Sequence, residues 1–225
     1  MSKKVLCLSL SELEAGICSL KKEKIGILGG SFNPVHNGHL LLAETARKEV
    51  GLHRILFLPT GRPYHKDRTA LLPFFIRVKM LELALEESLP SSPYFYSTME
   101  GERGGDSYTY DSLLLLRKAF PKASFYFILG TDEYFTLASW HEIHALGKLC
   151  TFLVANRNDA VAQSVLKEWE RKWKAMYGLC SLFLSMKGVD FSSSTIRKRL
   201  ERGESIHAMV PEAVENYIRE KHLYQ

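Results

Sequence analysis

Short apolar runs alternate with longer stretches of helical periodicity through most of this chain. Six runs rich in Ile, Leu, Val and Phe are typical of buried strands: KIGILG (24–29), RILFLP (54–59), YFYSTM (94–99), SFYFIL (124–129), CTFLVA (150–155) and SLFLSM (181–186). Apolar spacing of helical period predicts helices near 39–50, 74–87, 109–119, 132–147, 159–176, 194–202 and 211–221. This order predicts an α/β fold: a doubly wound parallel sheet with helices on both faces and a small C-terminal helical part.

A single domain is expected over residues 24–225, preceded by a polar, helical N-terminal extension over residues 1–23. Hydrophobic residues make up 46% of the sequence and charged residues 24%, a balance typical of soluble globular proteins and not of disordered or membrane chains. Glu12 and Glu14 interrupt the opening apolar stretch where a signal peptide would continue, and no apolar run is long enough to cross a bilayer. We therefore expect a cytoplasmic protein without a membrane partner.

The charge pattern limits the kinds of partner that the protein can bind, and the cysteine pattern limits the kinds of metal site and disulfide that it can form. The net charge is +5, but the basic residues are interleaved with Glu, as in KEWERKWK (167–174). Such mild basicity favours a nucleotide site over a nucleic-acid track, so no nucleic-acid partner is expected. The four cysteines form no CxxC pair, which argues against a zinc knuckle or a disulfide framework.

The segment GGSFNPVHNGHL (29–40) joins the first predicted strand to the first long helix. Gly29, Gly30 and Gly38 allow a ligand to approach the backbone closely, and a helix N-terminus attracts anions. His36 and His39 add donors for phosphate oxygens at that point. The alternative is that the two histidines only cap the helix. A zinc site is disfavoured because no third His or Cys lies nearby, and neither a P-loop nor a GxGxxG motif is present.

Two further segments carry groups suited to anions. FSSSTIRKRL (191–200) places Ser193 and Ser194 at a predicted helix start, with Arg197 one turn later. The alternative for this segment is an ordinary helix cap. The irregular stretch PTGRPYHKDRTALLP (59–73) follows a strand and carries Lys66, so it is a candidate substrate flap.

The two motifs GGSFNPVHNGHL and SSSTIR resemble the signatures of the nucleotidyltransferase superfamily, and the chain closely resembles the bacterial nicotinate-nucleotide adenylyltransferases within it. The supporting segments follow in the family's order: YHK (64–66), GGDSYTYDSL (104–113), ILGTDEYFTLASWHEI (128–143), FLVANR (152–157) and GESIHAMVPEAVENYIREKHLY (203–224). The resemblance covers nearly everything after residue 23. It implies a Rossmann-like sheet and transfer of the adenylyl group of ATP to nicotinate mononucleotide, which yields nicotinate adenine dinucleotide and pyrophosphate in NAD biosynthesis.

The resemblance also implies a role for particular residues. The catalytic set is His36, His39, Lys66 and Arg197. The expected ATP contacts are Gly29, Gly30, Ser31, Phe32, His36, Gly38, His39, Ser193, Ser194 and Arg197. The expected mononucleotide contacts are Asn33, Lys66, Thr109, Asp132, Trp140, His141 and Arg157. Mg²⁺ is expected to enter with ATP, without a dedicated protein metal site. Whether the chain forms a homo-oligomer is left open.

Alternatives remain for individual residues and for the whole chain. Trp140 is either a stacking platform for the pyridine ring or a core residue, and Asp132 either binds a ribose hydroxyl or caps a helix. Tyr64 and Ser194 replace the family's usual proline and threonine, and the extension over residues 1–23 has no counterpart. The competing functions are another small-phosphate nucleotidyltransferase, of the pantetheine phosphate type, and a nucleotide-binding module without chemistry.

Overall fold

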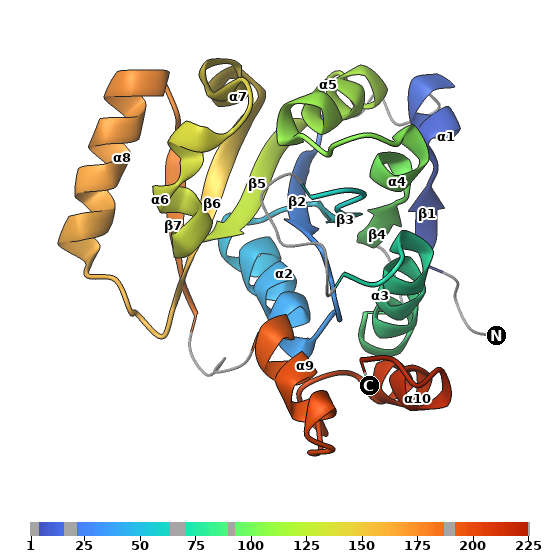
Figure 1. The fold of residues 1–225 in the computed structure, drawn as a ribbon. Helices are drawn as coiled ribbons and strands as arrows, with labels where there is room; N and C mark the ends of the chain where they lie inside the picture. The colour runs from blue at the N-terminus through green and yellow to red at the C-terminus, as the bar shows by residue number, and fades with distance from the viewer. Residues whose placement is uncertain (1–4, 16–21, 64–70, 90–92, 187–191, 225) are drawn as a thin grey trace.

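The computed structural model describes residues 5–15, 22–63, 71–89, 93–186 and 192–224. Its strands form one parallel sheet in the order β1-β4-β3-β2-β5-β6-β7 (Figure 1). The strands are β1 (Leu6–Leu8), β2 (Lys24–Gly30), β3 (Arg54–Pro59), β4 (Tyr94–Ser97), β5 (Ser124–Gly130), β6 (Cys150–Arg157) and β7 (Ser181–Met186). The six strands that the sequence predicts are confirmed.

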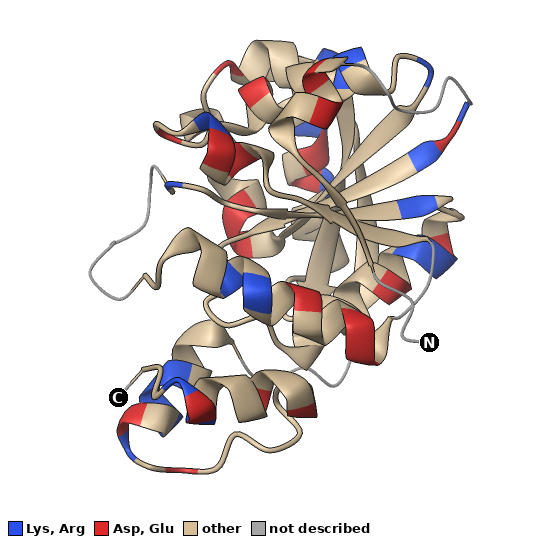
Figure 2. Ribbon diagram, turned by 90° about the vertical axis from the view of Figure 1, so that its right-hand side faces the viewer, with Lys and Arg blue, Asp and Glu red and all other residues tan. Residues whose placement is uncertain are grey.

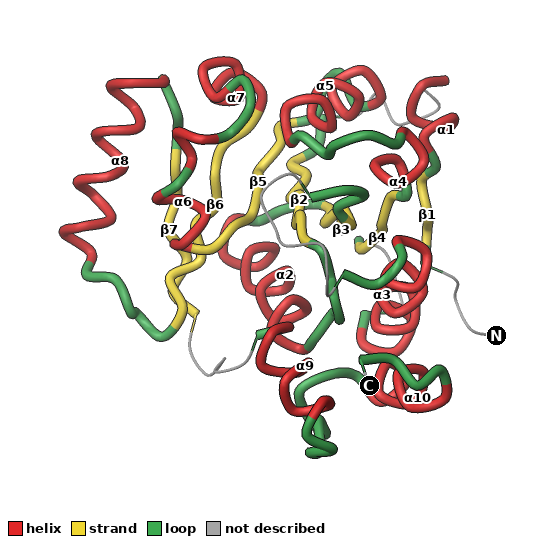
Figure 3. The backbone as a smooth tube through the Cα atoms, in the orientation of Figure 1, coloured by secondary structure: helices red, strands yellow, loops and turns green. Residues whose placement is uncertain are grey.

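Helices cover both faces of the sheet, as the tube view in Figure 3 shows. One apolar core lies under α2 (Asn37–Val50), α3 (Phe74–Ser88), α9 (Ser193–Glu201) and α10 (Glu212–Glu220). The core on the opposite face lies under α1 (Leu10–Ala15), α4 (Met99–Arg103), α5 (Thr109–Ala119), α6 (Thr131–Phe135), α7 (Ile143–Leu149) and α8 (Gln163–Tyr177). The predicted doubly wound α/β fold, with its small C-terminal helical part, is therefore confirmed.

The strand order reverses between β2 and β5, which lie side by side in the middle of the sheet. From β2 the chain winds outward through β3 and β4, and from β5 it winds in the opposite direction through β6 and β7. In such sheets the connections leaving the two central strands part to opposite faces, which opens a crevice at their carboxyl ends. The fold therefore places the most favourable ligand site beside Gly30 and Gly130.

The N-terminal segment differs from the predicted helical extension. Leu6–Leu8 form the edge strand β1, which pairs in parallel with β4, and α1 follows it. Leu8 is buried, and its carbonyl accepts hydrogen bonds from Ser97 Oγ (2.5 Å) and from the Thr98 N–H. This strand is three residues long, too short for its alternation to stand out in the sequence.

The helix predicted over 132–147 is broken into α6, a 3₁₀ turn at Leu137–Ser139, and α7. Thr136 Oγ1 donates to the Glu133 carbonyl (3.0 Å) and Ser139 Oγ to the Thr136 carbonyl (2.8 Å), so side chains compete for groups that a continuous helix would use. Glu142 then adopts a left-handed conformation (φ 53°) before α7 begins. The break turns Trp140 and His141 out of helical structure.

Charged residues of both signs lie on the same helices and loops (Figure 2). Several pairs are local, such as Lys48 with Glu44 (3.0 Å) and Arg219 with Glu215 (2.9 Å). Among the described residues, no helix is long and apolar enough to cross a membrane.

Candidate active site

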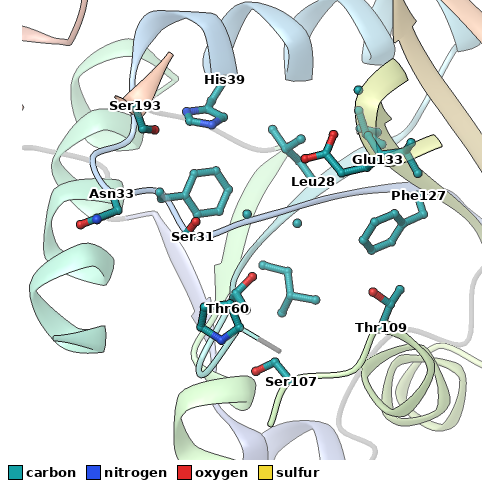
Figure 4. A pocket seen from close by; sticks show the side chains of 18 of the residues that line it. Leu28, Ser31, Asn33, His39, Thr60, Ser107, Thr109, Phe127, Glu133 and Ser193 are labelled. Atoms are coloured by element: carbon teal, nitrogen blue, oxygen red, sulfur yellow. The ribbon is translucent and has the colours of Figure 1, made fainter. Parts of the chain in front are cut away.

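A cleft of about 790 Å³ opens at the carboxyl ends of β2 and β5 (Figure 4). Its lining includes 14 of the residues that the sequence singles out: Gly29, Gly30, Ser31, Phe32, Asn33, His36, His39, Thr109, Trp140, His141, Arg157, Ser193, Ser194 and Arg197. These residues come from five segments spread over the chain. The cleft coincides with the point where the strand order reverses.

His36 and His39 stack on one another at the entrance to α2. Their ring centroids lie 3.7 Å apart, and the His36 N–H donates to His39 Nδ1 at 3.2 Å. Because Nδ1 accepts this bond, the ring proton of a neutral His39 is on Nε2. The Phe32 ring meets the His39 ring nearly edge-on at 5.0 Å. The helix-capping interpretation and the ligand interpretation of His39 are therefore compatible.

The first turn of α2 offers fewer backbone donors than the sequence suggests. The Asn37 N–H donates to the Met209 carbonyl (2.9 Å) and the His39 N–H to the His36 carbonyl (2.9 Å). Gly38 is buried within α2 and is absent from the cleft lining. Anion binding at this end therefore depends on side chains more than on helix N–H groups.

His36 is almost completely buried, and this burial lowers its pKa to about 4, with the positive charge of Arg157 as a smaller cause. The ring is consequently neutral near pH 7. In the unfolded chain the same side chain regains a pKa near 6.5. Between these two values the unfolded state binds more protons than the folded state, so stability falls as pH falls.

His36 is therefore expected to make folding sensitive to acid. Between pH 7.5 and pH 4.5 it should lower the free energy of unfolding by about 2–3 kcal/mol, and the His36→Gln variant should lack this component. Urea unfolding of both proteins at the two pH values measures the difference, because the other titrating groups cancel. Equal pH dependence in the two proteins would show that His36 is not buried in the neutral form.

The serine motif docks on the first motif. Ser193 Oγ donates to the Pro34 carbonyl (2.9 Å), and Arg197 Nη1 donates to the Asn33 carbonyl (2.8 Å). Ser192 caps α9 by accepting from the Thr195 N–H (3.2 Å), so the cap predicted as an alternative is present as well. Two segments about 160 residues apart in sequence therefore form one wall of the cleft.

The other end of the cleft is aromatic. Trp140 is half-buried and meets the Phe127 ring edge-on at 5.7 Å, and the rings of His141 and Tyr108 lie 4.5 Å apart. Thr109 begins α5 beside Tyr108. In Figure 4, Thr109 and Ser107 lie across the cleft from His39 and Ser193. The cleft thus has a polar, cationic end and an aromatic end.

Gly29 is required by packing as well as by ligand access. A Cβ at residue 29 would lie 2.9 Å from Phe127 Cζ, whereas a Cβ at residue 30 would lie 3.5 Å from the Phe32 ring, an ordinary contact. Phe127 cannot easily move away, because the rings of Trp140 and Phe152 pack against it at 5.7 and 6.4 Å.

Gly29→Ala should therefore overpack the cleft wall and lower the free energy of unfolding by about 1–3 kcal/mol. Gly30→Ala is the matched control, and its loss should be clearly smaller. Urea unfolding of both variants provides the comparison. Equal losses at the two positions would mean that Phe127 does not constrain residue 29.

Three of the predicted site residues are not part of the described lining. Gly38 is buried in α2, Asp132 is exposed on α6 outside the cleft, and Lys66 lies outside the described residues, as does Tyr64. The neighbour of Asp132, Glu133, lines the cleft instead. A one-residue difference on a helix turns a side chain by about 100°, which sequence inspection does not resolve.

Several lining residues carry no recognisable signal in the sequence. Phe127 lies in an ordinary apolar strand, and Tyr108 and Ser107 lie in a loop. Glu100 is buried, accepts from Ser112 Oγ (2.7 Å) and from the Gly61 N–H (3.2 Å), and has its pKa raised mainly by burial. Only their contacts across the fold reveal these residues.

A buried arginine fixes the backbone on one side of the cleft. Arg77 of α3 is 1% exposed and donates to the carbonyls of Ser31 (2.6 Å), Thr60 (2.9 Å), Gly61 (3.1 Å) and Leu72 (2.9 Å). Burial lowers its pKa to about 10, so it remains charged at neutral pH. This one guanidinium joins the loop after β2 to the loop after β3.

The donors at the polar end suit an anionic ligand with several oxygens. Arg157, Arg197 and the two histidines face the cleft, along with the hydroxyls of Ser193 and Ser194. Within the described part of the chain, no group of three His, Cys, Asp or Glu side chains is arranged to hold a metal ion. The arrangement can bind a polyphosphate at one end and an aromatic ring at the other.

Comparison with known proteins agrees with this geometry. Residues 27–199 match the family model described as Cytidylyltransferase-like. A Dehalococcoides mccartyi protein named "Probable nicotinate-nucleotide adenylyltransferase" is 41% identical over 203 residues, which cover 89% of this chain and 97% of that protein. A Geotalea uraniireducens protein of the same name is 36% identical over 214 residues, covering 89% and 98%.

Solved structures share the fold. A Plasmodium falciparum nicotinic acid mononucleotide adenylyltransferase complexed with NaAD superposes with a TM-score of 0.73 at 23% identity, covering 90% of this chain and 97% of that one. At this level of identity the likeness supports the fold alone. The matched family model and the extended sequence identity together show that this chain belongs to the nicotinate-nucleotide adenylyltransferase family of cytidylyltransferase-like proteins.

Proposed function

We propose that this protein transfers the adenylyl group of ATP to nicotinate mononucleotide, giving nicotinate adenine dinucleotide and pyrophosphate, a step in NAD biosynthesis. The observation that carries the proposal is the junction of the two motifs, where Ser193 and Arg197 donate to the backbone of Pro34 and Asn33 beside the paired histidines. Relatives that are 36–41% identical over nearly their whole length carry names for this activity.

The reaction needs positioning more than acid–base chemistry. The mononucleotide phosphate is already ionised, so it can attack the α-phosphorus of ATP directly. A new P–O bond forms as the bond between the α-phosphorus and the bridging oxygen breaks, and pyrophosphate leaves with the electron pair. Charge develops on the phosphoryl oxygens in the transition state, and fixed donors that point at them lower the barrier.

The polar end of the cleft is assigned to ATP. His39 would donate from Nε2 to the α-phosphoryl, because its Nδ1 is already an acceptor. The neutral His36 would hold a neighbouring oxygen, and Ser194 and Arg197 would hold the β- and γ-phosphates. Ser193 would join them once its hydroxyl turns from the Pro34 carbonyl to a phosphate oxygen. The backbone of Gly29, Gly30, Ser31 and Phe32 would form the floor beneath the nucleotide. Gly38 is left with an indirect role inside α2.

The aromatic end is assigned to the mononucleotide. Trp140 would stack on the pyridine ring, and Thr109 and His141 flank it in the cleft lining. Asn33 and Arg157 also line the cleft and would contact the phosphate of the mononucleotide. Asp132 lies outside the lining, so we assign no substrate contact to it. Lys66 remains a proposed phosphate contact from the flap.

Mg²⁺ would enter as the complex with ATP and neutralise charge on the β- and γ-phosphates. The side chains that line the cleft suit a metal ion that arrives bound to ATP better than one that the protein binds by itself. Two of the described carboxylates line the cleft: Glu100, which is buried and hydrogen-bonded to Ser112 and Gly61, and Glu133 of α6. Phosphate oxygens and water would therefore supply most of the ligands.

The proposal also covers the domain organisation, the cellular location and the oligomeric state of the protein. Residues 24–225 would form the catalytic domain, with residues 1–23 as an extension whose described part adds β1 to the sheet edge. We place the enzyme in the cytoplasm, where its nucleotide substrates are made. Assembly as a homo-oligomer remains compatible with the exposed edge strands β1 and β7.

Pyrophosphate release tests the assignment. The purified protein is incubated with ATP and Mg²⁺ together with nicotinate mononucleotide, with phosphopantetheine, or with no acceptor. Rapid release only with nicotinate mononucleotide supports the proposal. Faster release with phosphopantetheine would assign the protein to the alternative transferase class, and no release with any acceptor would favour a binding module.

A further inference from the structure

Two side chains of opposite charge, Arg77 and Glu100, are buried beside the cleft, and neither takes part in the proposed transfer. Arg77 is 1% exposed and Glu100 is 5% exposed. Both hold the same residue of the loop after β3: the Gly61 carbonyl accepts from Arg77 Nη2 (3.1 Å), and the Gly61 N–H donates to Glu100 Oε2 (3.2 Å). The two charges therefore fix the backbone of Gly61 from both sides.

Arg77 ties this loop to the wall assigned to ATP. Its Nη1 donates to the Ser31 carbonyl (2.6 Å) in the loop after β2, and its Nη2 donates to the Thr60 carbonyl (2.9 Å). The Thr60 N–H donates in turn to the Gly30 carbonyl (2.9 Å). The backbone after β3 is therefore held against the backbone after β2 at several adjacent points.

Glu100 ties the same loop to the wall assigned to the mononucleotide. Its Oε1 accepts from Ser112 Oγ (2.7 Å), and Ser112 is the fourth residue of α5, the helix that Thr109 begins. The Ser107 hydroxyl lies near enough to lower the pKa of Glu100. One carboxyl group therefore contacts the loop after β3 and the first turn of α5.

The loop after β3 also pairs directly with the segment before α5. The Arg62 N–H donates to Ser107 Oγ (3.1 Å), and the Ser107 N–H donates to the Arg62 carbonyl (2.9 Å). In Figure 4, Thr60 lies between Ser31 and Ser107. The loop is therefore the spacer between the two walls of the cleft.

The packing leaves this spacer little freedom. A Cβ at residue 61 would overlap the Glu100 carbonyl oxygen, so the loop lies directly against α4. Burial raises the pKa of Glu100, and the bonds from Ser112 and Gly61 and the charge of Arg103 oppose that rise. Buried charges are costly unless partners satisfy them, so the loss of one partner disturbs the whole arrangement.

We propose that Arg77 and Glu100 are positioning residues for the transfer: through Gly61 they fix the spacing between the loop after β2, which holds ATP, and the start of α5, which holds the mononucleotide. Each substrate alone needs one wall, whereas the reaction needs both walls in register. A misplacement of about 1 Å can lower a rate about a hundredfold. The inference rests on the proposed function for the identity of the two substrates.

Glu100→Ala and Glu100→Gln separate positioning from charge. Glu100→Ala should lower kcat about ten- to a hundredfold and change the KM of each substrate less than threefold. In Glu100→Gln, the amide oxygen can accept from the Gly61 N–H and the NH₂ can donate to Ser112 Oγ, so kcat should stay within about threefold of wild type. Equal losses in the two variants would show that the charge itself is needed and would overturn the positioning role.

Arg77→Lys tests the other half of the pair. It keeps the positive charge, but a single ammonium cannot donate to all the carbonyls that the planar guanidinium reaches. It should lower kcat as Glu100→Ala does. Because both residues act through Gly61, the double variant should lose little more than the worse single variant. Multiplicative losses would mean that Arg77 and Glu100 act independently and would contradict the proposal.

Leu81→Ala is the matched control for stability. Leu81 is fully buried on α3, the helix that carries Arg77, and its aliphatic side chain has no group with which to hold a loop. Leu81→Ala should lower Tm and keep wild-type kcat. If Leu81→Ala lowers kcat as much as Arg77→Lys does, the effect is general destabilisation and the proposal fails. If Glu100→Ala does not fold, Ser112→Ala removes one anchor of Glu100 and should lower kcat by a smaller factor.

Calorimetric titration with nicotinate adenine dinucleotide tests the spacing without turnover, because this ligand occupies both ends of the cleft at once. Its affinity should fall at least tenfold in Glu100→Ala and Arg77→Lys, whereas the affinities for ATP alone and for nicotinate mononucleotide alone should change less than threefold. Equal losses for all three ligands, or an unchanged affinity for the dinucleotide, would reject the proposal. A wild-type protein that binds the dinucleotide but releases no pyrophosphate would reject the proposed function and leave this test intact.

Discussion

Replacing His39 with alanine is expected to lower kcat by about two to three orders of magnitude while the protein stays folded. This is the range for losing one preorganised donor to a charged transition state. The ring is held for this role by the bond from the His36 N–H to Nδ1, by stacking on His36 and by the edge of Phe32. Steady-state kinetics at saturating ATP and mononucleotide, with circular dichroism as the check on folding, measures the effect.

His53→Ala is the matched control for this prediction. His53 is exposed just before β3, at the end of the sheet opposite the cleft, and should leave kcat unchanged. If the His39→Ala variant unfolds, the main role of His39 is to cap α2. Near wild-type turnover in a folded His39→Ala variant would remove His39 from the catalytic assignment.

Nicotinate mononucleotide should be preferred over nicotinamide mononucleotide by roughly a hundredfold or more in kcat/KM. The two substrates differ only in a carboxylate against a carboxamide. Trp140 and His141 lie in the break between helices, and the His141 N–H donates to no other described residue. An amide NH₂ directed at this N–H would leave it unpaired, at a cost of about 1–3 kcal/mol, and the hundredfold ratio corresponds to the upper end of that range. Competition between the two mononucleotides at limiting ATP gives the ratio directly.

Trp140→Ala provides the control for this preference. Stacking on the pyridine ring is the same for the acid and the amide, so the variant should lose efficiency with both substrates and keep most of the ratio. Comparable efficiencies of the two substrates with the wild-type enzyme would contradict a charge-reading role for the residues around Trp140.

The fold follows from patterns that are local in sequence. The runs that form β2, β3 and β6 are mostly apolar because these inner strands are buried on both faces, whereas the edge strand β7 alternates buried and exposed residues. The helices between the strands have clear periods. The break at Leu137–Ser139 depends on the hydroxyls of Thr136 and Ser139, and helical periodicity does not record such competition. The strand β1 is stabilised by pairing with β4, about 90 residues away, which no local pattern reveals.

The site residues also fall into two groups: those that local sequence motifs reveal and those that only contacts across the fold reveal. Gly29, His36 and Ser193 lie in compact motifs whose residue types suit either a phosphate site or a helix cap, and the resemblance of these motifs to the family signatures favours the phosphate site. Phe127 and Arg77 are recognised only from packing: one fits against Gly29, and the other donates to four backbone carbonyls from three segments. The hydrogen bond from the Tyr224 hydroxyl to Asn33 Oδ1 (2.8 Å) joins residues 191 positions apart, which no local pattern reveals.

The central claim is that the mononucleotide phosphate attacks the α-phosphorus of ATP directly in this cleft. The most direct test uses ATP with one sulfur in place of a nonbridging α-phosphate oxygen, as a single diastereomer, together with nicotinate mononucleotide and Mg²⁺. Direct attack predicts a thio-substituted dinucleotide whose phosphorus has the inverted configuration. Retention of configuration would require a covalent enzyme intermediate, and either that outcome or the failure to form any dinucleotide would contradict the claim.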